Sequence, residues 1–230
     1  MHFDYSYDGV MRSYEQALQR LALDTVDALV IHDLDAGFHG DALAGYERQL
    51  FDSGVRALQE LKASGDIKAF GIGVNTGEAL ETTAARAPVD FALVAMPYTL
   101  LDQASLHTGM ATCVRRGVSV IIGAPFASGI LVTGSRAGAT YAYGQASPEI
   151  QQRVQRIEEV CRTHGVPLPS AALQFPLAHP AVVSIIPGAA RASEVTQNIA
   201  SLGLPIPSAF WLDLKNQGLI DKEAPVPSEG

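Results

Sequence analysis

Five short runs of apolar residues recur along the chain, and each is nearly continuous instead of alternating with polar residues. Strands with this pattern are typically buried on both faces, as in a parallel sheet covered by helices. The runs are Ala28–His32, Ala69–Val74, Phe91–Met96, Val118–Gly123 and Val182–Ile186. Helical patterns precede, separate and follow them, at Ser13–Leu23, Gly54–Ser64, Gly77–Arg86, Ala104–Arg116, Pro148–His164, Ser170–His179, Ala192–Ser201 and Ser208–Gly218. This alternation predicts right-handed βαβ units around one parallel sheet.

Two architectures accommodate such strands: an open doubly wound sheet, and a (β/α)₈ barrel from which three units are missing. The helix Ser13–Leu23 precedes every candidate strand, so we expect the chain to begin within a βα unit, which favours the barrel. The predicted fold class is therefore α/β, a partial (β/α)₈ TIM barrel with strands 4–8 and their helices, in a single domain over residues 1–230. The interval Ala127–Gln145 is unusually long, which is typical of functional or mobile loops.

Composition narrows the possible functions. Apolar residues make up 47% of the chain and charged residues 17%, which suits a sizeable buried core. The net charge of −8, without a cluster of Lys and Arg, argues against a nucleic-acid surface. The two cysteines, Cys113 and Cys161, form no metal or redox motif. No apolar stretch approaches the length of about 18 residues that a membrane span needs, and the N-terminus lacks a signal-peptide pattern. We expect a cytoplasmic protein with no membrane or nucleic-acid partner.

The first predicted strand ends in His32, and Asp33, Asp35 and His39 follow closely. In parallel α/β folds, functional residues gather at the C-terminal ends of the strands. His32 stands where a catalytic imidazole would lie, although a histidine that only satisfies a neighbour at the barrel mouth would look the same. A metal site of these four residues is a weaker alternative, because the later strand ends offer no His, Cys, Asp or Glu.

Small and amide-bearing residues follow the later strands. Asn75 comes directly after the second strand, where it could bind an amide or simply cap the next helix. Backbone amides around Ser128 and Gly129 could hold phosphate oxygens. The last strand leads through Gly188 and Arg191 into a helix whose N-terminus favours an anion. Phosphate sites in barrels often form from the loops after the last two strands, so these segments predict a phosphate site.

In this order, the strand ends resemble those of the aldo/keto reductase superfamily. Within it they are most similar to the L-fucose and D-threo-aldose 1-dehydrogenases and to pyridoxal 4-dehydrogenase. The resemblance covers almost the whole chain, and the combination of segments is more specific than any one of them. The segments are Phe3–Val10, Val30–Asp33, Gly73–Asn75, Tyr98–Gln103, Ser128–Leu131, Phe175–Pro180 and Ile186–Gly188.

The resemblance implies a catalytic tetrad of Asp, Tyr, Lys and His around a nicotinamide ring. His32 matches the histidine, which hydrogen-bonds the reacting oxygen. The other three residues belong to the first three strands of the family's barrel, which we expect this chain to lack. The tyrosine is the general acid/base, and the lysine lowers its pKa. By this reasoning the chain alone is expected to be inactive or nearly so.

The resemblance also implies a cofactor site. The matched residues, from the nicotinamide end to the adenosine end, are Asn75, Ser128, Gly129, Gly188 and Asn198. Many members place a lysine for the 2′-phosphate of NADP where this chain has Gly188, and only Arg191 offers positive charge nearby. NAD is therefore the expected cofactor, with NADP as the alternative.

The expected parent activity is oxidation of an aldose, such as L-fucose or a D-threo-aldose, at C1 to its lactone. The substrate would be a small sugar or aldehyde. A catalytically inactive nucleotide-binding or interaction fragment of the same fold is the alternative, and a metal hydrolase using His32, Asp33 and His39 is a third reading. The missing strands would leave unpaired sheet edges, so we also expect self-association through those edges.

Overall fold

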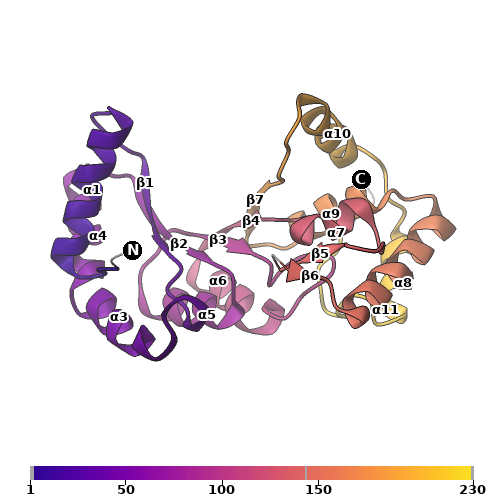
Figure 1. The fold of residues 1–230 in the computed structure, drawn as a ribbon, viewed down its shortest axis with the longest axis horizontal. Helices are drawn as coiled ribbons and strands as arrows, with labels where there is room; N and C mark the ends of the chain where they lie inside the picture. The colour runs from indigo at the N-terminus through magenta and orange to yellow at the C-terminus, as the bar shows by residue number, and fades with distance from the viewer. Residues whose placement is uncertain (1–2, 143, 229–230) are drawn as a thin grey trace. The chain divides into compact units, whose positions relative to one another are not determined.

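The computed structural model describes residues 3–142 and 144–228, and its main sheet has five strands in the order β1-β2-β3-β4-β7 (Figure 1). All five strands lie where the apolar runs predict them, and β3 and β4 are each one residue shorter than predicted. The α/β class with a parallel sheet is confirmed. The strands are β1 (Ala28–His32), β2 (Ala69–Val74), β3 (Phe91–Ala95), β4 (Ser119–Gly123) and β7 (Val182–Ile186).

Strand pairing aligns residues that matter for the site. β1 and β2 are parallel, and His32 at the end of β1 is opposite Gly73. β4 and β7 are also parallel, with an irregularity after Val120 and with Gly123 opposite Ile186. A small antiparallel hairpin of β5 (Thr140–Tyr141) and β6 (Gly144–Gln145) occupies the end of the long interval after β4.

Every predicted helix has a counterpart in the structure. The helices are α1 (Tyr7–Leu21), α2 (Ala36–His39), α3 (Leu43–Gln49), α4 (Val55–Ser64), α5 (Gly77–Arg86), α6 (Ala111–Arg116), α7 (Ile130–Thr133), α8 (Pro148–His164), α9 (Leu168–Leu177), α10 (Ala192–Leu202) and α11 (Ser208–Asn216). Short 3₁₀ or π turns join some of them: η1 (Gly40–Ala42), η2 (Leu50–Gly54), η3 (Leu106–Met110) and η4 (Ala127–Gly129). The short helices α2, α3 and α7 were not predicted.

The predicted start of the first helix at Ser13 is wrong. α1 begins at Tyr7 because Ser6 caps it: the Ser6 hydroxyl accepts a hydrogen bond from the Gly9 amide at 3.2 Å. Asp8 in the first turn places a negative charge at the positive end of the helix.

The chain divides into two compact units. The first comprises the residues up to Leu93 together with Thr108–Ser119, and the second comprises Val94–His107 with the residues from Val120 onward. Each unit has its own buried side chains. In the first these include Leu50, Leu58, Ile67, Phe70, Ile72 and Leu80. In the second they include Tyr98, Leu100, Phe175, Phe210 and Trp211.

Aromatic contacts organise the core of the second unit. The Phe175 ring stacks on Tyr98 with centroids 5.6 Å apart, and Trp211 meets Phe210 edge to face at 4.9 Å. The unit is thus built around α9 and α11. Across the described residues, no helix is both long and apolar enough to cross a membrane.

Candidate functional site

His32 is the last residue of β1, and its side chain is 68% exposed. The neighbouring Asp33 carboxylate is only 11% exposed, and its Oδ2 lies 2.7 Å from the His32 Nδ1. The Asp33 amide donates to the carbonyl of Gly73 at 3.1 Å, which extends the β1–β2 pairing by one residue. A nearly buried carboxylate therefore holds an exposed imidazole by one ring nitrogen.

Asn75 joins the same group of side chains. Its Nδ2 donates to the Asp33 Oδ1 at 3.3 Å, so each oxygen of the carboxylate has its own donor. The sequence assigned Asn75 to the nicotinamide and did not predict its bond to Asp33. The structure brings His32, Asp33 and Asn75 together.

Gly73 leaves room for the His32 ring. A Cβ atom built on Gly73 would lie 3.1 Å from His32 Cδ2 and 3.3 Å from Val30 Cγ1. Both distances are shorter than ordinary van der Waals contact, so a larger residue would displace the imidazole. The missing side chain at Gly73 thus contributes to the position of His32.

Tyr5 supports this region from the segment before α1. Its hydroxyl lies 2.9 Å from the His32 carbonyl oxygen and 2.9 Å from the His39 Nε2. Burial raises the pKa of Tyr5 to about 12, and the negative charges of Asp33 and Asp35 add to the rise. The ring of His39 also packs against Tyr46, with centroids 4.6 Å apart.

The metal alternative receives no geometric support from these contacts. His39 is buried and engaged by Tyr5, and Asp35 caps α2 by accepting from the Phe38 amide at 3.1 Å. Among the described residues, no three His, Cys, Asp or Glu side chains are placed to hold a metal ion.

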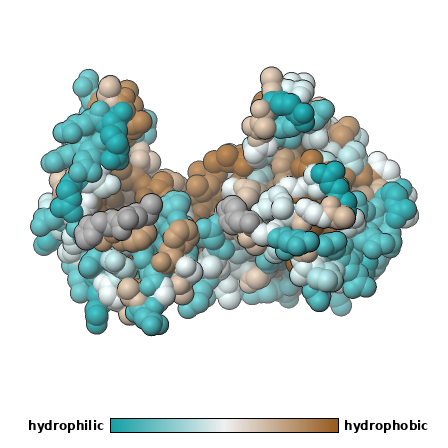
Figure 2. Space-filling view, in the orientation of Figure 1, coloured by the Kyte–Doolittle hydropathy of each residue, from teal (hydrophilic) through white to brown (hydrophobic). Residues whose placement is uncertain are grey.

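His32 and Asp33 also line a cavity of about 440 Å³ between α1 and the outer edge of β1. Its walls are mostly apolar, and Figure 2 shows hydrophobic surface beside α1 on the side of β1. The other lining residues are Phe3, Asp4, Tyr5, Gly9, Val10, Ser13, Tyr14, Leu29, Val30, Ile31, Phe38, Leu50 and Leu58.

A second cavity, of about 690 Å³, lies in the second unit. It brings together the five predicted cofactor residues of that unit, Ser128, Gly129, Gly188, Arg191 and Asn198. These come from three separate segments: η4 after β4, the loop after β7, and α10. The remaining lining residues are Ala124, Phe126, Val132, Thr133, Pro169, Glu194, Gln197 and Ser201.

The backbone on one side of this cavity is tightly turned. Ser128 has φ 60° and Gly129 has φ 98°, both in the left-handed region. The Ser128 carbonyl accepts from the Thr140 hydroxyl at 2.8 Å, which ties the β5–β6 hairpin to η4. A Cβ atom placed on Gly188, by contrast, would have no neighbour within 4 Å, so the cavity is open at that residue.

Glu194 occupies the positive end of α10. Its Oε2 accepts from the Ala190 amide at 2.7 Å, and its Oε1 accepts from the Arg191 Nη2 at 2.7 Å and Nε at 3.0 Å. These donors hold the pKa of Glu194 below its usual value, with the Ala190 amide as the largest cause. Arg191 lines the cavity, and its charge is paired with the Glu194 carboxylate.

Non-glycine residues with left-handed backbone cluster just after strands. Asp33 follows β1, Met96 follows β3 and Ala124 follows β4, with φ values of 51°, 79° and 51°. Such conformations cost roughly 1–3 kcal/mol each and tend to persist at functional sites. Their position agrees with a functional role for the strand ends.

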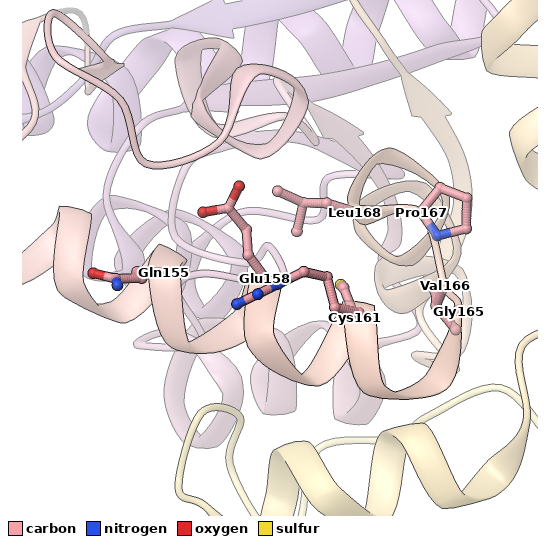
Figure 3. Close-up of a pocket in the computed structure, with 8 residues that line it drawn as sticks. Gln155, Glu158, Cys161, Gly165, Val166, Pro167 and Leu168 are labelled. Carbon is pink, nitrogen blue, oxygen red and sulfur yellow. The ribbon is translucent and has the colours of Figure 1, made fainter.

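A third cavity, of about 530 Å³, contains none of the predicted site residues (Figure 3). It lies where α8 ends and the chain turns through Gly165 into α9. Burial raises the pKa of Cys161 in its wall to about 12, so the thiol is a poor nucleophile. Glu158 is engaged by the amide and hydroxyl of Ser135. We assign this cavity no chemistry.

Two features of the site were missed from the sequence. The contribution of Gly73 depends on a cross-strand neighbour and left no local signal. Glu194 did leave a signal, because an acidic residue in the first turn of a predicted helix favours the positive end of the helix.

Comparison with known proteins gives consistent matches. The aldo/keto reductase family model matches residues 1–216. A pyridoxal 4-dehydrogenase from Microbacterium luteolum is 39% identical over 219 residues, 95% of this chain and 64% of that protein. A D-threo-aldose 1-dehydrogenase from a Pseudomonas species is 34% identical, again over 95% of this chain and 64% of that protein. The chain thus spans 64% of the length of these curated relatives.

A solved structure also matches. The holo form of an aldo-keto reductase from Bacillus halodurans superposes with a TM-score of 0.72 at 23% identity, over 98% of this chain and 71% of that one. This likeness supports the predicted fold class, part of a TIM-type barrel.

Proposed function

The chain belongs to the aldo/keto reductase family, and from that premise we propose that it forms the nucleotide-binding portion of an NAD-dependent oxidoreductase. The parent reaction is oxidation of an aldose at C1 to its lactone. Aldo/keto reductases use nicotinamide cofactors, and the bound cofactor would accept the hydride that leaves C1. The residues of this chain bind the nucleotide and orient the reacting oxygen.

The observation that supports this proposal most is the cavity in the second unit. The sequence predicts a cofactor role for five residues of this unit, and all of them line the cavity: Ser128, Gly129, Gly188, Arg191 and Asn198. Its volume of about 690 Å³ is within the range of about 300–1,000 Å³ typical of small-molecule sites. We assign the pyrophosphate to Ser128 and Gly129 and the adenosine end to Gly188 and Asn198.

The fit of the residues favours NAD over NADP. A 2′-phosphate needs free cations or backbone amides, and helix N-termini often supply them. Here the Glu194 carboxylate already accepts from the Ala190 amide and from two of the Arg191 donors, Nε and Nη2. A 2′-phosphate would have to displace Glu194 or lie against its negative charge, whereas the hydroxyl of NAD adds no charge.

The substrate proposal follows the relatives. One is named for oxidation of D-threo-aldoses at carbon 1 and the other for oxidation of pyridoxal. In the aldose reaction, the C1 hydrogen leaves as hydride and the C1 hydroxyl loses its proton, which leaves the lactone carbonyl. We assign His32 to the hydroxyl oxygen, as the exposed imidazole at the end of β1.

We do not assign proton transfer to Tyr5, Tyr98 or Tyr141, because the pKa of each is raised. Burial raises the pKa of Tyr5 and Tyr141 to about 12, and it raises the pKa of Tyr98 as well. A tyrosine acting as acid/base near neutral pH needs its pKa lowered instead. This favours, as a second candidate function, nucleotide binding without steady turnover by this chain alone.

A substitution at Gly188 tests the nucleotide site. A Cβ atom there meets no neighbour within 4 Å, so Gly188→Leu should fold normally and project into the cavity. We expect NADH affinity to fall at least tenfold, or about 1.4 kcal/mol, measured by calorimetry with circular dichroism as a check on folding.

Gly203→Leu is the matched control. Gly203 follows α10, outside the cavity, and a Cβ there would meet only the Ala200 carbonyl at 3.8 Å. This variant should bind NADH like the unchanged chain. Equal affinities for both variants would remove the assignment of the cavity to the nucleotide.

A further inference from the structure

We propose that Asp33 is a positioning residue that fixes the tautomer of His32. The neutral imidazole then carries its hydrogen on Nδ1 and offers Nε2 as a hydrogen-bond acceptor to a substrate hydroxyl. The inference depends on the proposed function only for the identity of that hydroxyl. The tautomer itself is a property of this chain.

The contact between the two side chains determines where the hydrogen lies. His32 Nδ1 and Asp33 Oδ2 are 2.7 Å apart, the distance of a strong hydrogen bond. An ionised carboxylate can only accept, so the hydrogen must be on Nδ1. A neutral imidazole has one donor and one acceptor, so Nε2 is then the acceptor.

The surroundings hold the carboxylate in place. Its second oxygen accepts from Asn75, and the Asp33 side chain is only 11% exposed. Asp33 also has φ 51°, a left-handed conformation that Asp and Asn tolerate better than most residues. The backbone bond from the Asp33 amide to the Gly73 carbonyl fixes this turn against β2.

The edge of the His32 ring that carries Nε2 is accessible. Within the part of the chain that the structure describes, the ring has one hydrogen-bond partner, Asp33, and its side chain is 68% exposed. The Cδ2–Nε2 edge lies next to Gly73, which has no side chain to cover it. A ligand oxygen can therefore approach Nε2.

This arrangement selects for one oxidation state of the ligand. A hydroxyl can donate to the Nε2 lone pair, whereas a carbonyl oxygen has only lone pairs of its own and would be repelled. The neutral ring suits an alcohol or a hemiacetal, the reduced partner of the proposed reaction. A hydroxyl has one hydrogen, so the proton held in this contact is the one that the hydroxyl gives up when C1 is oxidised.

The test is nitrogen NMR of the full chain labelled with ¹⁵N-histidine, recorded at a pH where the rings are neutral. His179 provides an internal reference with the opposite tautomer. Its Nδ1 accepts from the Ala181 amide at 3.2 Å, so the hydrogen of its neutral ring must lie on Nε2. Burial also lowers the pKa of His179, which keeps it neutral. We expect His32, assigned by loss of its signals in His32→Gln, to show the reverse pattern. A hydrogen on Nε2 of His32 would overturn the proposal.

Two variants separate the hydrogen bond from a general charge effect. Asp33→Gly removes the carboxylate while glycine tolerates the left-handed backbone, and it should move the His32 hydrogen to Nε2. Asp35→Asn removes a nearby charge but keeps a side chain that can cap α2, and it should leave the tautomer unchanged.

An unchanged tautomer in Asp33→Gly, or the same shift in Asp35→Asn, would contradict the role of Asp33. These results are independent of NADH binding, so loss of the proposed function would not imitate them.

Discussion

Glu194 and Asp33 each accept hydrogen bonds from a side chain that the sequence pattern marked as functional. Asp33 binds His32, and Glu194 binds Arg191. In both cases the partner is within three residues along the chain. A carboxylate beside a ring orients it, and a carboxylate beside a guanidinium occupies some of its donors and offsets its charge. The chemistry of each site therefore depends on these acidic neighbours.

Removal of the Glu194 charge should weaken the preference for NAD. In Glu194→Gln, the Arg191 guanidinium and the Ala190 amide lose their anionic partner and can meet a 2′-phosphate. We expect NADPH affinity to rise on the order of tenfold relative to NADH, measured by titration with both nucleotides at constant salt.

Glu149→Gln is the control for this change. Glu149 lies in the first turn of α8, outside the cavity, and its removal also deletes one charge near a helix start. An equal gain in NADPH affinity for this variant would mean that net charge, and not the local contact, sets the preference.

The positions of single functional residues along the chain could be predicted from the sequence, but the side chains that they contact could not. The ends of apolar runs identified His32, Asn75, Ser128 and Gly188, because strand ends can be read from local hydrophobicity. Their partners could not be read in this way. Whether Asn75 binds Asp33 or caps a helix depends on side-chain rotamers, which the tertiary structure determines.

Among the elements, β2 shows how glycines set the packing of a strand. A Cβ on Gly71 would lie 2.5 Å from the Phe91 carbonyl oxygen and 2.7 Å from the Phe91 ring. A Cβ on Gly73 would meet mainly the exposed His32 ring at 3.1 Å. The Phe91 carbonyl oxygen belongs to the backbone and cannot move away, whereas the His32 ring can rotate.

Alanine at these two positions should therefore have unequal effects. We expect Gly71→Ala to lower the free energy of unfolding by about 2–3 kcal/mol through overpacking. Gly73→Ala should lower it by less than about 1 kcal/mol and chiefly displace His32. Urea unfolding followed by circular dichroism measures both, and a larger loss for Gly73→Ala would contradict the packing described for β2.

The elements differ in how much of them the sequence could predict. The strands β1, β2 and β7 and the long helix α8 were predicted to the residue, since apolar periodicity and end signals coincide there. The start of α1 was misplaced because the Ser6 cap lies before the apolar pattern begins. The π turns η2 and η3 continue helices with an irregular hydrogen-bond pattern and leave no signal of their own.

At the scale of the whole molecule, the sheet order places β1 and β7 at the two ends of the main sheet. Each bears exposed apolar side chains: Val30 on β1 is 43% exposed, and Val183 and Ile186 on β7 are 62% and 54% exposed. Strand edges with apolar side chains favour pairing with another chain.

These edges predict concentration-dependent self-association. Substituting both Val183→Lys and Ile186→Lys should reduce it, because charged residues on an edge strand oppose pairing. Sedimentation velocity across a wide range of protein concentration is the measurement. Leu212→Lys, at a residue 58% exposed on α11, is the control and should associate like the unchanged chain. A strictly monomeric chain at every concentration would exclude this use of the edges.

Calorimetric titration of the 230-residue chain with NADH and NADPH tests the proposed nucleotide site. The cavity lined by Ser128, Gly188 and Asn198, with Glu194 at the start of α10, predicts saturable binding that is tighter for NADH. A folded chain that binds neither nucleotide, or that binds NADPH more tightly, would contradict the proposed nucleotide site.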